Sequence, residues 1–182
     1  MMVKTVFSGF GGQGVLVMGY VFAHGAMNEG CHVTYLPAYG AEVRGGTANC
    51  TVAVSDEEIA SPIASEPDFV VAMNTPSLYS FQNKIAAGGG LFLNSSIVQA
   101  RPSRKDLVVY EIPSSEIAEK LGNPRTANTV IMGAFLKQTA LVKPEVYLKS
   151  LETIMGGKKK SVLEANRRAF YAGYEFLERK GA

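Results

Sequence analysis

The sequence predicts an α/β fold: a three-layer single domain over residues 1–182, with a mainly parallel sheet, a Rossmann-like start and a helical C-terminal third. The length of 182 residues suits one globular domain. A short apolar run at 3–8 leads into a glycine-rich loop, then a helical pattern over 15–28, then a β-rich run at 31–36. This is a β-loop-α-β unit, whose strands normally run parallel. From about residue 126 the apolar spacing is helical to the end of the chain.

Short β-rich runs between turn signals predict the remaining strands. They lie at 47–54, 69–73, 91–94 and 107–112. The second strand, at 31–36, is expected to end at Pro37. The strands and the helical segments between them together favour one sheet covered by helices.

Capping residues predict where helices begin. Thr75 is expected to cap a helix with Pro76 at its first position. Ser161 and Glu164 match a capping box that starts the last helix. The remaining helices are expected from 114 to 121, from 130 to 141 and from 144 to 155. The segment from 130 to 141 is apolar on most faces, so it should be buried between other elements.

Composition excludes several classes of protein. With 47% hydrophobic and 19% charged residues, the chain is expected to fold around a core and not to be disordered. A net charge of +2 is too small to indicate nucleic-acid binding. No run of about 18 apolar residues could span a membrane, and no signal peptide precedes the first strand. The expected location is therefore cytoplasmic.

The cysteines and histidines predict no metal site in this chain. Cys31 and Cys50 are far apart in sequence and form no C-x-x-C pair, whereas zinc and iron–sulfur sites usually need about four ligands. Both are expected to be reduced core thiols. His24 lies in a mostly apolar helical segment and His32 in a strand, so both are expected to be structural. No catalytic residue is predicted.

A glycine-rich loop follows the first strand. The segment S-G-F-G-G-Q-G at 8–14 fits the spacing G-x-G-x-x-G. Without Cβ atoms its backbone N–H groups can approach an anion, and the next helix presents its positive end. The candidate ligand-binding residues of this loop are Gly9, Gly11, Gly12, Gln13 and Gly14. Three interpretations stay open: a phosphate-bearing ligand, contact with a partner subunit, or glycines that only allow close packing of helix and strand.

Binding of NAD or FAD is disfavoured by the residues after the second strand. A site for NAD or FAD needs an acidic residue at the end of the second strand, where its carboxylate binds the ribose hydroxyls. The segment T-Y-L-P-A at 34–38 contains none, and Glu29 lies before the strand, at its wrong end. Gln13 is open to two interpretations, since its amide can bind a ligand or partner, or can cap amides of its own loop.

A second loop, Y-G-A-E-V-R-G-G-T-A-N at 39–49, follows the second strand. In a parallel sheet it should leave the same edge as the glycine-rich loop, where ligands of open α/β sheets bind. Arg44 is the strongest candidate for holding a carboxylate or phosphate. The alternative is an ion pair with Glu42 or with a neighbour. The candidates of this loop are Glu42, Arg44, Gly45, Gly46, Thr47 and Asn49.

These two loops together resemble the gamma subunit of the 2-oxoacid:ferredoxin oxidoreductases, which act on pyruvate, 2-oxoisovalerate or 2-oxoglutarate. The similarity continues in order along nearly the whole chain. The further segments are AMNTPS at 72–77, GLFLNSS at 90–96, LGNPRTAN at 121–128, EANRRAF at 164–170 and GY at 173–174. The two loops are the most specific part of the resemblance.

The resemblance implies a subunit of a larger enzyme. Family enzymes carry out coenzyme A-dependent oxidative decarboxylation of a 2-oxoacid and pass electrons to ferredoxin. The resemblance implies that thiamine diphosphate, magnesium and iron–sulfur clusters belong to partner chains: alpha, beta and ferredoxin-like delta subunits. This chain has neither a G-D-G segment with a downstream asparagine for the magnesium nor a cysteine set for a cluster. It would complete the assembly and help to cover coenzyme A.

Two further segments carry weaker signals. Asn123 and Asn128 match a family motif, but capping of helix ends explains them equally well. Lys158–Lys160 reads as a solvated turn, or as a contact with the phosphates of coenzyme A or with an acidic ferredoxin. Alternative functions are the small subunit of an indolepyruvate-type enzyme, a free-standing nucleotide-binding protein, and a binding module without a ligand. The substrate acid and the stoichiometry stay open.

Overall fold

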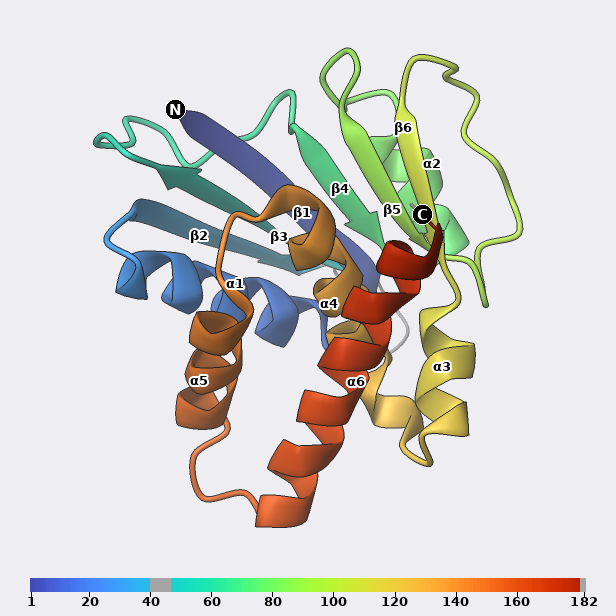
Figure 1. Ribbon diagram of the computed structural model, residues 1–182. Coiled ribbons are helices and arrows are strands. Elements are labelled where there is room, and N and C mark those ends of the chain that lie inside the picture. Colours follow the sequence, from blue (N-terminus) through green and yellow to red (C-terminus); the bar gives the residue numbers. More distant parts are fainter. Residues whose placement is uncertain (40–46, 181–182) are drawn as a thin grey trace.

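The computed structural model describes residues 1–39 and 47–180, and its chain forms one six-stranded sheet with helices on both faces (Figure 1). The strands occur in the spatial order β2-β3-β1-β4-β5-β6. Their bounds are β1 (Met2–Phe10), β2 (His32–Tyr39), β3 (Thr47–Ser55), β4 (Phe69–Ala72), β5 (Gly90–Asn94) and β6 (Val108–Ile112).

The sheet is mainly parallel, as predicted. β1 pairs with β4, β4 with β5, and β5 with β6, all in parallel. β3 runs antiparallel to both of its neighbours, β1 and β2. Consequently β1 and β2 point the same way, as a β-loop-α-β unit requires, but they are not adjacent because β3 lies between them. Local sequence signals contain no information about that insertion.

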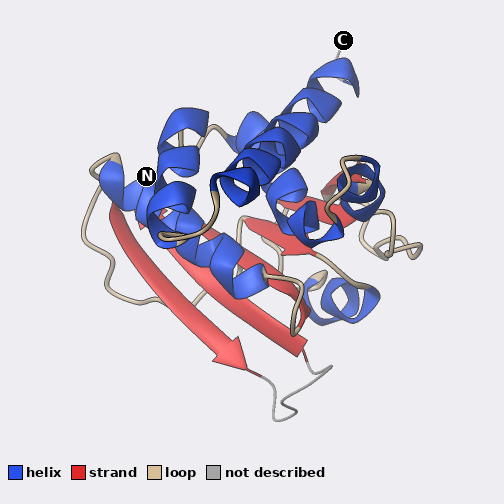
Figure 2. Ribbon diagram, turned by 90° about the horizontal axis from the view of Figure 1, so that it is seen from below, coloured by secondary structure: helices blue, strands red, loops and turns tan. Residues whose placement is uncertain are grey.

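The helices form the outer layers. Their bounds are α1 (Val15–Asn28), α2 (Thr75–Phe81), α3 (Ser114–Lys120), the 3₁₀ turn η1 (Pro124–Thr126), α4 (Ala127–Thr139), α5 (Pro144–Ile154) and α6 (Lys160–Lys180). α2 packs on one face of the sheet, around Leu78, and the other helices gather on the opposite face (Figure 2). The helical C-terminal third is confirmed.

The larger core cluster is centred on α4. Phe135 packs edge-on against Phe7, Phe22 and Phe92, with ring centroids 5.7, 5.6 and 5.1 Å away. Aromatic rings favour this edge-to-face geometry. Residues 129–136 of α4 are all buried, so the prediction of a helix enclosed by other elements is confirmed.

Two local predictions are wrong. β2 does not end at Pro37 but continues to Tyr39, with Pro37 opposite Cys50. β2 lies at the edge of the sheet, and an edge strand tolerates proline because its outer side needs no backbone donor. The cap of α2 is Asn74, not Thr75: the Asn74 side chain accepts a hydrogen bond from the Ser77 N–H at 2.9 Å.

The last helix also begins two residues earlier than the capping box predicts, because an N-cap at Ser161 would place its first helical residue at 162. α6 starts at Lys160, and the carbonyl of Lys159 accepts the first backbone hydrogen bonds. Ser161 therefore lies inside the helix.

In the part of the chain that the structure describes, we find no helix with the length and apolarity that crossing a bilayer requires.

Candidate functional site

The carboxyl ends of the parallel strands meet at one edge of the sheet, which carries a row of polar side chains. Ser8 near the end of β1 donates to the hydroxyl of Ser77 at 2.8 Å. Asn94 at the end of β5 donates to the hydroxyl of Ser115 at 2.8 Å. Open α/β sheets bind ligands at this edge.

The glycine-rich loop turns from β1 into α1 at this edge. β1 ends at Phe10 and α1 begins at Val15, so Gly11 lies within the turn. Gly12 and Gly14 have positive φ angles of 96° and 74°, a region that disfavours residues with a Cβ atom. The first backbone N–H groups of α1 have no acceptor within the helix, which leaves its positive end at the loop.

Gln13 holds this loop in place. Its Oε1 accepts from the Phe10 N–H at 2.7 Å, and its Nε2 donates to the Met73 carbonyl at 3.2 Å. The Asn74 side chain also donates to Oε1, at 3.5 Å. Of the two interpretations of Gln13, the structure shows the capping of its own loop, extended by contacts to the segment after β4.

Close packing explains two of the glycines. A Cβ atom at Gly9 would lie 2.6 Å from Gln13 Oε1 and 2.9 Å from a methyl group of Val15. A Cβ atom at Gly14 would lie 2.5 Å from Asn128 Nδ2. Part of the glycine pattern therefore serves helix–strand packing, as one interpretation predicted, and the turn remains open to a ligand at Gly12.

Asn128 connects α4 to the glycine-rich loop. Its Nδ2 donates to the Gly14 carbonyl at 3.3 Å. The Thr129 hydroxyl donates to Asn166 Oδ1 of α6 at 2.8 Å and approaches Asn128 Oδ1 at 3.4 Å. Three sequence segments that lie far apart in the chain therefore meet in one hydrogen-bonded chain.

Asn123 has the capping role that was the alternative to ligand binding. Its side chain accepts from the Arg125 N–H at 3.3 Å and so begins η1. This cap sets the 3₁₀ turn against the glycine-rich loop, because residues of η1 and of the loop line the same hollow. Arg125 is thereby held beside the loop.

A hollow of about 270 Å³ opens beside the loop. It is lined by Gly12, Gln13, Met73, Ser115, Pro124, Arg125, Ala127 and Asn128. Among the described residues, Arg125 is the charged side chain of this lining and no carboxylate lies there. The positive end of α1 and the guanidinium of Arg125 together favour an anionic group. We call this space the loop hollow.

The described ends of the second loop lie at the same edge. Thr47 at the start of β3 pairs with Phe10, and Asn49 pairs with Ser8. The end of β1 and the described ends of the second loop therefore lie at the same edge, as predicted. Glu42, Arg44, Gly45 and Gly46 lie outside the described residues, and their role as a ligand or partner contact stays a prediction.

The strand order argues against a dinucleotide site. In the dinucleotide-binding arrangement the second strand lies next to the first and ends in the acidic residue. Here β3 takes that position and runs in the opposite direction. Its residues nearest the loop, Thr47 and Asn49, carry no carboxylate. The described part of this edge therefore lacks the ribose-binding acid.

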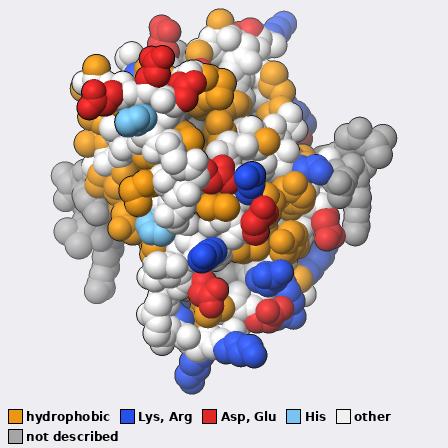
Figure 3. All heavy atoms as spheres, turned by 60° about the vertical axis from the view of Figure 1, so that its left-hand side comes forward, with side chains coloured by type: hydrophobic (Ala, Val, Ile, Leu, Met, Phe, Trp, Pro, Cys, Tyr) orange, Lys and Arg blue, Asp and Glu red, His pale blue; other side chains and the backbone are white. Residues whose placement is uncertain are grey.

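Away from the carboxyl edge of the sheet, the titratable side chains of the described residues form no catalytic cluster. His24 shares a hydrogen bond of 3.1 Å with Asn28 on the same helix, and the two histidines lie apart on one face (Figure 3). The described residues include no group of three or more His, Cys, Asp or Glu side chains placed to hold one metal ion. Two cysteines do not match the four thiolates that an iron–sulfur cluster takes.

The fold and the carboxyl edge of the sheet together define a Rossmann-like α/β protein. Its glycine-rich loop borders the loop hollow, whose lining favours an anion. Residues 4–176 match the family model described as pyruvate ferredoxin/flavodoxin oxidoreductase, and the chain belongs to this family.

Relatives with assigned names agree with this family. The chain is 40% identical over 176 residues to ketoisovalerate oxidoreductase subunit VorA of Methanothermobacter thermautotrophicus, covering 96% of this chain and 36% of that protein. It is 32% identical over 177 residues to 2-oxoglutarate synthase subunit KorC of Methanothermobacter marburgensis, covering 93% and 94%. The chain thus spans about a third of VorA and nearly all of KorC.

A solved structure is similar over nearly the whole chain. It is the gamma subunit of a keto/oxoacid ferredoxin oxidoreductase from Geobacter sulfurreducens, with a TM-score of 0.81 and 26% identity. The match covers 95% of this chain and 96% of that one. A 2-oxoglutarate:ferredoxin oxidoreductase from Magnetococcus marinus, 23% identical, shares the fold with a TM-score of 0.90 over 98% of this chain.

Several residues of the site were not predicted from the sequence. Asn74, Arg125 and Asn166 were not candidates, although all three lie in segments that carry the family resemblance. Asn74 lies two residues after the end of the buried strand β4, where side chains at the carboxyl edge of the sheet are expected. That position was a usable signal for Asn74. Asn166 gives no local signal, because only the packing of α6 on α4 brings it to Thr129.

Proposed function

We propose that this chain is the gamma subunit of a multi-subunit 2-oxoacid:ferredoxin oxidoreductase, with residues 1–182 as one domain. The enzyme would decarboxylate a 2-oxoacid oxidatively with coenzyme A and ferredoxin as co-substrates. The family match over residues 4–176 carries this proposal. The names of the relatives support pyruvate, ketoisovalerate or 2-oxoglutarate as the substrate class.

The cofactors of that reaction would lie on partner chains. Thiamine diphosphate with magnesium would supply the carbanion chemistry, and iron–sulfur clusters would accept the electrons. The proposed partners are the alpha, beta and ferredoxin-like delta subunits, with ferredoxin as acceptor and the cytoplasm as location. For this chain we propose no nucleophile, acid or base.

The contribution of this chain would be the carboxyl edge of its sheet. The loop hollow, with Gly12 and Arg125, would hold an anionic group of coenzyme A or of a partner subunit. Gly9, Gln13 and Gly14 would act by shaping that loop. Thr47 and Asn49, with Glu42, Arg44, Gly45 and Gly46, would border the same contact on the side of β3.

An exposed apolar stripe on α1 supports a role as a subunit. Val17, Tyr20 and Met27 lie on one face of the helix and are 47%, 48% and 56% exposed. Figure 3 shows hydrophobic side chains spread over this side of the molecule. Large apolar side chains grouped on a surface indicate a face that a partner covers.

Copurification tests the proposal. We expect the natively purified protein to elute with a thiamine diphosphate-binding chain and an iron–sulfur chain, and to show coenzyme A-dependent reduction of ferredoxin only in that complex. The isolated chain should be colourless and inactive. Elution as a free monomer in the presence of its coexpressed neighbours, with no activity gained on mixing, would refute the assignment.

A further inference from the structure

The hydrogen bonds that run from α6 to the glycine-rich loop have their centre at Thr129. The Thr129 side chain is 2% exposed, and its hydroxyl donates to Asn166 Oδ1 at 2.8 Å. Asn166 is 7% exposed and donates from Nδ2 to the Val162 carbonyl at 2.9 Å, one turn earlier in α6. That second bond fixes which end of the Asn166 amide faces Thr129. α6 therefore presents an acceptor at a defined position beside α4.

Thr129 also sets the orientation of the Asn128 side chain. The Thr129 backbone N–H donates to Asn128 Oδ1 at 2.9 Å, and the Thr129 hydroxyl lies 3.4 Å from the same oxygen. With Oδ1 on this side, the amide nitrogen of Asn128 faces the loop and donates to the Gly14 carbonyl at 3.3 Å. The reverse orientation would bring N–H donors together at Thr129 and set two oxygens against each other at Gly14.

The Gly14 carbonyl is the point where these hydrogen bonds reach the loop. It also accepts the Met18 N–H at 2.9 Å, within the first turn of α1. Gly14 precedes the helix in the left-handed conformation, with φ of 74°, and a side chain there would meet Asn128. The free N–H groups of the first turn follow directly and form the positive end of α1. A shift of Asn128 would therefore change the direction of these groups.

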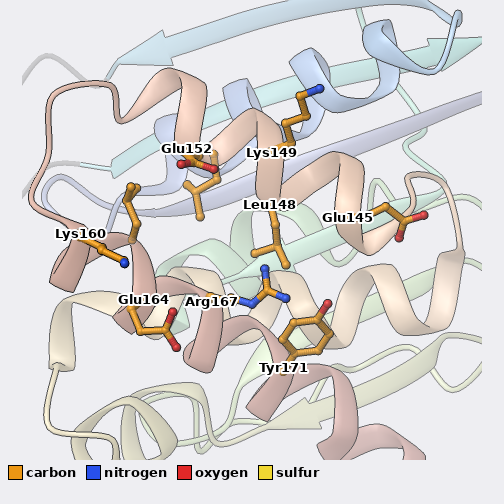
Figure 4. Close-up of a pocket in the computed structure, with 10 residues that line it drawn as sticks. Glu145, Leu148, Lys149, Glu152, Lys160, Glu164, Arg167 and Tyr171 are labelled. Carbon is orange, nitrogen blue, oxygen red and sulfur yellow. The ribbon is translucent and has the colours of Figure 1, made fainter.

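The packing of α6 on α4 leaves little freedom at this point. One turn beyond the hydrogen bond between the two helices, Gly133 of α4 lies directly against the Phe170 carbonyl of α6. The outer side of α6 differs, because Glu164 and Arg167 line the open groove between α5 and α6 (Figure 4). α6 thus turns Asn166 toward α4 while side chains close to it in sequence stay exposed.

We propose that Thr129 and Asn166 are positioning residues for the glycine-rich loop. They hold the Asn128 amide on the Gly14 carbonyl, so the loop keeps its anion-compatible geometry only while α6 is packed on α4. A partner chain that displaces α6 would loosen the loop without touching it. This inference rests on the proposed function for the biological role of the loop, but its test needs neither a ligand nor a partner.

Hydrogen–deuterium exchange of the full chain, resolved by residue with NMR, is the test. The amides of Gln13 and Met18 report on the loop, because they donate to the carbonyls at its two ends. Thr129→Val replaces the hydroxyl by a methyl group and leaves the Asn166 oxygen without its donor. We expect exchange at the two reporter amides to become about tenfold faster. Asn166→Leu should accelerate it at least threefold.

Three variants distinguish this coupling from a general loss of stability. Thr129→Ser keeps the hydroxyl, so exchange at the reporter amides should stay within about twofold of wild type. Val98→Ala removes buried methyl groups on the opposite face of the sheet. Glu164→Gln changes an exposed side chain two residues from Asn166. Both should leave the reporter amides unchanged, although Val98→Ala lowers the global stability.

A double variant decides whether the two residues act together. Thr129→Val combined with Asn166→Leu should exchange no faster than Thr129→Val alone, because both changes break the same hydrogen bond. The proposal is overturned if the double variant shows the product of the two single effects, if Thr129→Val changes nothing, or if Thr129→Ser or Val98→Ala accelerates exchange as much as Thr129→Val. A failed copurification would refute the subunit assignment and leave these exchange rates as they are.

Discussion

Cys50 shows how packing decides the chemistry of a single residue. Its thiol is fully buried and lies 3.5 Å from the Val15 carbonyl. A Cβ atom at Gly19 would overlap its sulfur, so the absence of a side chain at Gly19 makes room for the thiol. Burial raises the pKa of Cys50 from 9.0 to about 12. The nucleophilic thiolate is therefore absent at neutral pH.

We predict that a thiol reagent at pH 8 modifies one cysteine of the native protein. Cys31 is only partly buried and should react, whereas Cys50 should react only after unfolding. The measurement is colorimetric thiol counting with and without denaturant. Two rapid equivalents from the native protein would contradict the prediction, and Cys31→Ser, which should give none, is its control.

The same burial makes stability depend on alkaline pH. Because the folded-state pKa of Cys50 lies above the unfolded value, the stability that the neutral thiol contributes is fully present below about pH 9 and falls as the pH rises toward 12. We expect the unfolding free energies of wild type and Cys50→Ala to converge as the pH rises from about 9 to 11. Urea titrations at each pH measure this, and a constant difference would count against it.

Gln13 stabilises the glycine-rich loop through hydrogen bonds of its side chain. Gln13→Ala removes acceptors and donors for Phe10, Met73 and Asn74. We expect a loss of about 2 kcal/mol in unfolding free energy, because three hydrogen bonds are lost and each contributes about 0.5–1.5 kcal/mol net. Amide exchange at residues 10–14 should become faster. Exchange that stays unchanged would show that Gln13 does not hold the loop.

Gln13→Glu is the matched test of the loop hollow. It keeps the oxygen acceptor for the Phe10 N–H but places a carboxylate beside Gly12 and Arg125. We expect anion affinity at the loop hollow to fall about tenfold, while Gln13→Ala changes it less. Titration with coenzyme A and pyrophosphate measures both. Equal effects of the two variants would remove the electrostatic explanation.

At the scale of the elements, α4 and α6 approach each other through their backbones. A Cβ atom at Gly133 would overlap the Phe170 carbonyl of α6, and one at Gly173 would overlap the Val130 carbonyl of α4. The two helices thus touch through their backbones, each at a glycine. Small residues permit such an approach, and packing at this density tolerates no added methyl group without a shift.

Gly133→Ala should therefore destabilise the protein strongly. The new methyl group meets backbone, which cannot rotate away as a side chain can, so we expect a loss of about 3 kcal/mol in unfolding free energy. Chemical denaturation measures it. Arg168→Ala, at an exposed position of α6, is the control and should change stability by less than about 0.5 kcal/mol. Equal stability of both variants would contradict the proposed backbone contact.

At the scale of the whole molecule, the two faces of the sheet differ in what they leave exposed. The face with α1 carries the stripe of Val17, Tyr20 and Met27, whereas α2 on the opposite face exposes Tyr79. A stripe along one helix suits a flat interface with another chain. The proposed assembly would therefore use the α1 side of the molecule.

Met27→Lys tests this interface. We expect it to leave the stability of the isolated chain within about 0.5 kcal/mol, because the side chain is exposed. Its affinity for the partner chains should fall at least tenfold, because a lysine would have to be desolvated. Tyr79→Lys on α2 is the control and should assemble normally. The opposite pattern, with Tyr79→Lys disrupting assembly, would assign the interface to the α2 face.

Local patterns determined most of the elements. The β-loop-α-β start, the glycine-rich turn and the helical C-terminal third follow from hydrophobic spacing, glycine positions and proline, which act over a few residues. The helix over 15–28 agrees with α1, Val15–Asn28. The two loops on one edge also follow from local signals, because strands joined by a helix in this way run parallel.

Only the tertiary structure decided the order of the strands in the sheet and the hydrogen bonds between distant segments. The insertion of β3 between β1 and β2 depends on pairing between strands. Because β3 is the neighbour of β1, the second strand cannot supply the acidic residue of a dinucleotide site next to the glycine-rich loop. The hydrogen bonds from Gly14 to Asn128 and from Thr129 to Asn166 join residues that are 114 and 37 positions apart in the sequence. Such contacts depend on the packing of distant elements, which no short stretch of sequence encodes. Hydrophobic spacing therefore determined what forms, and long-range packing determined which polar side chains meet.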